Sequence, residues 1–68
     1  MDNAYRTWIG EEVVLQMLLE DSLVPLHGKL VKDNGETLRV RVGDGWDIDI
    51  YKNTVLAVEE NSRIFLPV

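Results

Sequence analysis

The chain has 68 residues, no cysteine, one histidine and a formal net charge of −5 at pH 7. A chain this short forms one domain, residues 1–68, close to the lower size limit for a self-sufficient core. Disulfides, thiolate metal ligands and histidine-rich zinc sites are excluded, and we expect no cofactor. The negative charge disfavours non-specific attraction to nucleic acid or to an anionic membrane. No stretch is long enough to span a bilayer, so we expect a cytoplasmic protein.

The first part of the chain predicts a short helix followed by a strand. Residues 2–9 fit a helix capped by Asp2 or Asn3. Its buried side would hold Tyr5, Trp8 and Ile9. The segment 11–19 fits both a helix and a strand, because its apolar residues follow either spacing. We favour the strand, since the segment is rich in valine and leucine and the later hairpins need a partner to close a barrel.

A long strand is expected over residues 23–32, after a turn at 20–22. Pro25 cannot donate a backbone hydrogen bond, so it should lie at an edge or an irregularity. Gly28 lies where a long strand can bend sharply and cross from one side of a small barrel to the other.

Residues 26–51 fit two successive hairpins whose residues match across the strands. With Gly43-Asp44-Gly45 as a three-residue turn, apolar residues pair on one face and cations pair with anions on the other. These pairs are Val42–Trp46, Val40–Ile48, Leu38–Ile50, Arg41–Asp47 and Arg39–Asp49. A preceding turn at Asp33-Asn34-Gly35 gives Lys32–Glu36, Leu30–Leu38, Gly28–Val40 and Leu26–Val42. The pattern predicts an all-β protein, built as a small and strongly bent antiparallel barrel.

The last strand, residues 54–59, is apolar at four consecutive positions, 55–58, instead of alternating. Such a run indicates that both faces of the strand are covered. The apolar tail at 63–68 must also be covered, since it would promote aggregation if left in water. Either the tail covers its own barrel, or strand edges and tails pair between identical subunits. We expect the second arrangement, and hence a homo-oligomer.

Over residues 10–60 the sequence resembles the Sm-like superfamily, which contains Sm and LSm proteins and Hfq-type RNA chaperones. The first motif is matched by Val13, Leu15, Met17, Gly28, Leu30, Asp33, Leu38 and Val40. The second is matched by residues 50–55, whose Tyr51-Lys52-Asn53 is similar to the Tyr-Lys-His of Hfq-type proteins. The resemblance implies a short helix before a five-stranded Sm-like (SH3-like) barrel, and a ring that pairs the fourth strand of one subunit with the fifth of the next. A ring of about five to seven subunits would place these residues in its interface: Ile50, Val55, Leu56, Ala57 and Val58.

The resemblance also implies an RNA site, although the residues by which the family holds a base are replaced. The asparagine after the motif aspartate falls on Thr37, and the arginine-glycine pair falls on Tyr51 and Lys52. A tyrosine can stack on a base and a lysine can meet a phosphate. The candidate contacts with single-stranded RNA are Tyr51, Lys52, Asn53, Thr37 and Asn34. Tyr51 and Lys52 equally fit an ordinary strand end beside a turn.

Other residues give weaker signals. Asp44, Asp47 and Asp49 do not follow a calcium-loop pattern, and the register pairs two of them with arginines. His27 lacks companion ligands, and both tryptophans are expected in the core, with Trp46 on the inward face. No nucleophile with a base and no phosphate loop is recognisable, so we expect no enzyme. Two other functions stay open: a ring that is a protein scaffold without RNA, and a monomeric SH3-like adaptor that binds peptide.

Overall fold

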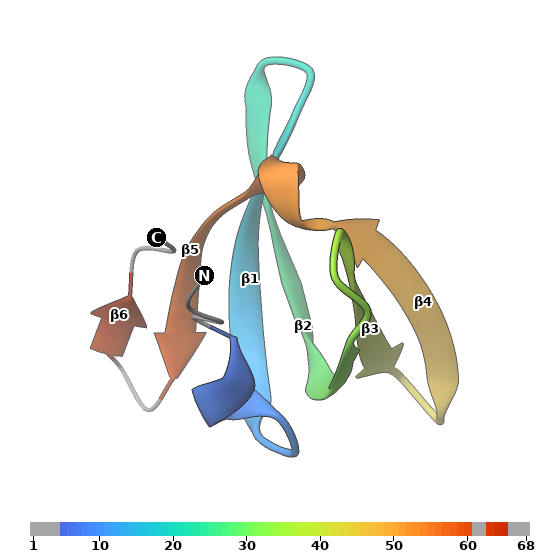
Figure 1. Cartoon of the computed structure of the whole chain (residues 1–68). Helices are drawn as coiled ribbons and strands as arrows, with labels where there is room; N and C mark the ends of the chain where they lie inside the picture. The colour runs from blue at the N-terminus through green and yellow to red at the C-terminus, as the bar shows by residue number, and fades with distance from the viewer. Residues whose placement is uncertain (1–4, 61–62, 66–68) are drawn as a thin grey trace.

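The computed structural model describes residues 5–60 and 63–65. They form one antiparallel sheet that coils strongly around a core (Figure 1). The elements in chain order are η1 (Arg6–Trp8), β1 (Glu12–Leu19), β2 (Ser22–Asp33), β3 (Thr37–Val42), β4 (Trp46–Tyr51), η2 (Lys52–Thr54), β5 (Val55–Glu60) and β6 (Arg63–Phe65). The strand order is β4-β3-β2-β1-β5-β6, and the two η elements are single 3-10 turns. The prediction of a small all-β, barrel-like fold is confirmed, and the sheet gains a sixth strand.

The amino-terminal helix is shorter than predicted. Tyr5 and Trp8 are buried as expected, and their rings meet edge-on with centroids 6.0 Å apart. Ile9 is exposed, which corrects its predicted burial. The chain leaves the helical turn at Ile9 and extends to Gly10, whose amide donates to the Leu30 carbonyl. The predicted caps at positions 2 and 3 lie outside the described residues.

The ambiguous segment 11–19 is a strand, as favoured from its composition. β1 pairs with β2 along its whole length and with β5 on its other side. The core lies inside the coiled sheet, and its fully buried residues are Leu15, Leu30, Leu38, Val40 and Val58. Pro25 pairs with Gln16 in the part of β2 that lies beyond its contacts with β3, which fits a residue that cannot donate to a second neighbour.

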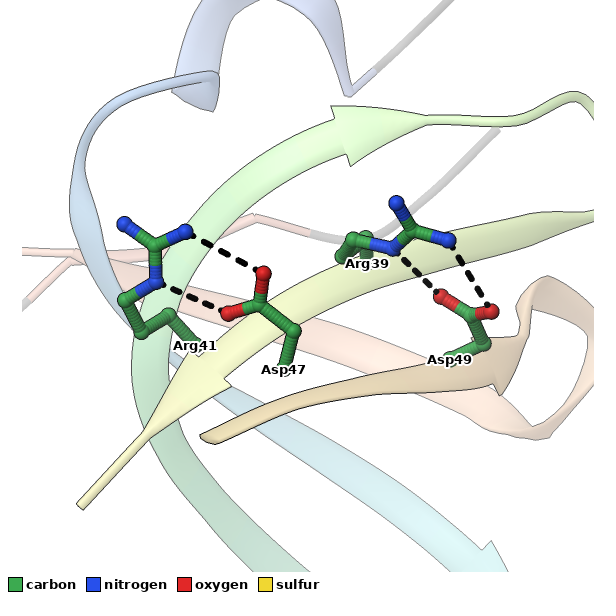
Figure 2. A network of polar contacts seen from close by, with 4 residues as sticks. All are labelled: Arg39, Arg41, Asp47 and Asp49. Atoms are coloured by element: carbon green, nitrogen blue, oxygen red, sulfur yellow. Dashed lines mark hydrogen bonds and ion pairs between the residues drawn. The ribbon is translucent and has the colours of Figure 1, made fainter. Parts of the chain in front are cut away.

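The register of the β3–β4 hairpin is the predicted one. Apolar pairs run from Val42–Trp46 to Leu38–Ile50, with Thr37 opposite Tyr51 at the open end. On the outer face Arg41 pairs with Asp47 and Arg39 with Asp49, and each guanidinium donates to both carboxylate oxygens (Figure 2).

The predicted register of β2 against β3 is wrong. Leu30 lies opposite Val40 instead of Leu38, a shift of two residues that keeps Leu30 on its expected inner face. A bulge between Leu30 and Lys32 then adds one residue to β2 and places Asp33 opposite Leu38. Leu38 is fully buried, so the bulge turns the Asp33 carboxylate towards the inside of the barrel.

The unbroken apolar run of β5 is accommodated within one chain. Val55 pairs with Met17 and Ala57 with Gln16, so Leu56 is the extra residue of a bulge and is exposed. Val55, Ala57 and Val58 are buried. Part of the apolar tail returns as β6 and pairs with the outer edge of β5, so Val58 lies opposite Phe65. Residues 66–68 of the tail lie outside the described residues.

A candidate binding pocket beside η2

The junction of β4 and η2 carries the residues that were predicted to contact RNA. Tyr51 ends β4 and is 64% exposed. Lys52 and Asn53 follow in η2, which is closed by Thr54, whose hydroxyl donates to the Tyr51 carbonyl at 2.7 Å. An open pocket of about 420 Å³ lies here, lined by Glu36, Tyr51, Lys52 and Asn53.

Glu36 was not among the predicted site residues. The Lys52 amide donates to the Glu36 carbonyl with an N···O distance of 2.9 Å, which ties the β2–β3 turn to η2. The signal was present in the sequence, because Thr37 pairs with Tyr51 in the predicted register and Glu36 directly precedes Thr37.

The remaining predicted contacts, Thr37 and Asn34, do not line the pocket. Thr37 is half-buried beside Tyr51, as its place in the hairpin implies. Asn34 is exposed in the turn, where its backbone N–H donates to the Thr37 carbonyl with an N···O distance of 2.8 Å. Both residues shape the turn that presents Glu36.

The Lys52 ammonium is engaged within its own chain. Its Nζ lies 2.8 Å from Asp33 Oδ1 and 5.4 Å from the centre of the Tyr5 ring. The exposed fraction of the side chain is 28% for Lys52 and 9% for Asp33. Asp33 Oδ1 also accepts the Gly35 amide at 2.9 Å. A phosphate that approached Lys52 would therefore compete with a nearly buried carboxylate.

The surroundings of Asp33 also affect Tyr5. Burial raises the pKa of the Tyr5 phenol above its ordinary value of 10.0, and the negative charge of Asp33 raises this pKa further. The ring beneath the Lys52 ammonium therefore stays a neutral phenol at ordinary pH, and the cation lies over an uncharged aromatic face.

Two further cations are paired on the outer face of the β3–β4 hairpin (Figure 2). Hydrogen bonds to Asp49 and Asp47 raise the pKa values of Arg39 and Arg41 respectively. The hydrogen bond from Arg41 lowers the pKa of Asp47. Together with Lys52, three cations among the described residues are thus each held by a carboxylate, which reduces their availability to a phosphate.

A second exposed feature is the hairpin between β1 and β2, which projects beyond the rest of the sheet (Figure 1). Leu18 pairs with Leu23, and both are exposed, as are Leu19 and Val24. Glu20 at the tip has a φ of +56°, a left-handed conformation that non-glycine residues rarely adopt. Sequence reasoning gave this hairpin no role.

The described residues offer little for other chemistry. Within them no group of three or more histidine, cysteine, aspartate or glutamate side chains could hold a metal ion. None of the helices in the same residues has the length and hydropathy needed to cross a membrane. Comparisons with protein-family models, with curated proteins and with solved structures gave no match for this chain.

Proposed function

We propose that the protein is a non-catalytic, Sm-like barrel that holds bases of single-stranded RNA at the pocket beside η2. The observation that carries the proposal is the exposed ring of Tyr51 at the rim of that pocket. A base can stack on the ring, and Asn53 and Glu36, which line the same pocket, carry groups able to hydrogen-bond to it. The antiparallel sheet of β1 to β5, bent around one core after a short helical turn, agrees with the five-stranded barrel that the resemblance implies.

One such pocket binds weakly. Stacking on an aromatic side chain contributes about 1–3 kcal/mol per base, whereas a dissociation constant of about 1 mM already corresponds to about 4 kcal/mol. Several linked pockets in a homo-oligomer would gain affinity by multivalency. Because Lys52 is bound to Asp33, few phosphate contacts are expected and the affinity should depend little on salt.

The test is a fluorescence-anisotropy titration with short oligo-U and oligo-A at low and near-physiological salt. We expect saturable binding that falls by no more than about threefold over a fourfold rise in salt, as for about one phosphate contact. The Tyr51→Ala variant should bind about tenfold or more weakly, and Ile64→Ala, an exposed position on β6 at the other end of the sheet from β4, should bind like the parent. Lys52 is left intact, since its removal would strand the Asp33 carboxylate. Equal binding by parent and Tyr51→Ala would contradict the site.

A second candidate is an interaction module that binds protein and no RNA. The paired state of Lys52, Arg39 and Arg41 favours it, together with the exposed apolar surface of the β1–β2 hairpin. The same titration separates the two functions, because this candidate requires the absence of RNA binding at both salt concentrations.

A further inference from the structure

The strand β4 is an unprotected end of the sheet. The strand order ends at β4, and none of the described strands pairs with its outer edge. Backbone N–H and C=O groups along such an edge are open to pairing with another chain. The opposite end is β6, which has three residues against six in β4, and very short edge strands resist such pairing.

The inner face of β4 is apolar, and its first half is open to solvent, whereas Ile50 is buried. Trp46 is 73% exposed and Ile48 is 39% exposed, which corrects the prediction that Trp46 packs in the core. Ile48 lies opposite Val40, which is fully buried. The apolar surface therefore continues from the core onto the edge strand, where it is exposed. An exposed tryptophan beside free backbone groups marks a surface that fits another strand.

The outer face of β4 presents no unbalanced charge to an approaching strand. Charged side chains on an edge strand oppose its pairing with another chain. Here Asp47 and Asp49 are each held by an arginine of β3, with closest N···O distances of 2.8 and 3.1 Å (Figure 2). The electrostatic protection is therefore largely removed within the chain itself.

We propose that the protein forms a two-fold homodimer in which β4 pairs antiparallel with β4 of a second copy, centred on Ile48. This register places Ile48 against the same residue of the second copy and encloses both Trp46 side chains along the seam. On the outer face Asp47 comes to lie opposite Asp49 of the second copy, flanked by the arginines that neutralise each of them. The arrangement leaves β6 in place on β5, whereas a ring that used the outer edge of β5 would displace it.

The interface is small, at the low end of specific interfaces, so a dissociation constant on the order of 10 µM is expected. Sedimentation from about 1 to about 200 µM brackets this value and should show a monomer–dimer equilibrium. A two-fold axis sets residue 48 against itself. Ile48→Lys alone and Ile48→Glu alone should therefore each be monomeric, and an equimolar mixture of the two should recover a dimer.

A control variant and a folding check accompany the Ile48 variants. Ile64→Lys changes an exposed apolar residue on β6, at the other end of the sheet from β4, and should dimerise like the parent. Circular dichroism should show that each variant is folded. A parent protein that is monomeric throughout overturns the proposal, as does an oligomer that both Ile48 variants still form. A species larger than a dimer, or variants whose mixture stays monomeric, rules out the two-fold pairing.

Discussion

The carboxylate of Asp33 is held by groups from two segments of the chain and acts electrostatically on a third. It pairs with Lys52 of η2, accepts the Gly35 amide of its own turn, and lies near enough to Tyr5 to raise the pKa of that phenol. A carboxylate that is 9% exposed depends on such partners, because an unpaired buried charge is destabilising. The ion pair beside the pocket is therefore first a structural contact.

Removal of Lys52 is expected to destabilise the fold. Lys52→Ala leaves Asp33 without its cation, and the free energy of unfolding should fall by about 1–3 kcal/mol in urea or thermal unfolding. Lys32→Ala, which removes an exposed lysine of β2, should change stability by less than about 0.5 kcal/mol. If the two variants are equally stable, the ion pair contributes nothing measurable.

Tyr5 gives a pH-dependent prediction. The folded chain holds the phenolic proton more tightly than the unfolded chain does, since burial and the Asp33 charge raise the pKa of Tyr5 above 10.0. The resulting stabilisation is complete below pH 10.0 and is lost as the pH rises through the raised pKa. Thermal unfolding measured across this alkaline range should show a steeper loss for the parent than for Tyr5→Phe. Parallel curves for the two proteins would contradict the assignment.

Among the strands, β2 depends on a residue without a side chain where β3 crosses it. A Cβ at Gly28 would lie 2.6 Å from Cγ1 of Val40 and 2.8 Å from the Arg41 carbonyl oxygen, both shorter than normal contacts. Gly28→Ala should therefore lower the free energy of unfolding by about 1–3 kcal/mol. Gly35→Ala is the comparison variant. At Gly35 φ is +99° and a Cβ would meet nothing within 4 Å, so this substitution reports backbone strain without crowding. Full stability of Gly28→Ala would show that the strands can separate at this point.

The two hairpins show what a sequence pattern can and cannot determine. The β3–β4 register was predictable, because a slip of one residue would set Val42 against Asp47. The β2–β3 register was not, because a slip of two keeps apolar residues opposite one another and only the bulge near Leu30 selects the true pairing. Alternation also assigned Trp46 to the inner face correctly, but it carries no information on whether another element covers that face.

The pocket was predictable only in part, for similar reasons. Tyr51, Lys52 and Asn53 follow one another in the chain, and their place at the end of β4 followed from the hairpin register. The burial of Asp33 depends on the bulge in β2, which shifts alternation by one residue. Its pairing with Lys52, which reduces the expected attraction to phosphate, was therefore not visible in the sequence.

At the scale of the whole molecule, the two proposals place their features on the same strand. The pocket begins at Tyr51, three positions from the proposed centre of the dimer at Ile48. In an antiparallel pair the two pockets would then lie about six residues apart along the seam, a separation of roughly 20 Å. A single base would reach one pocket only, and bivalent binding would need an RNA long enough to span both.

The contacts around Asp33 also couple two distant ends of the chain. Lys52 is both a wall of the pocket and the cation above the Tyr5 ring, so the position of η2 and the order of the amino-terminal segment are not independent. Thermodynamic linkage makes this relation reciprocal. A molecule that fixes η2 on binding would also hold the amino-terminal turn, and a partner that draws this turn away would weaken binding at the pocket by the same factor.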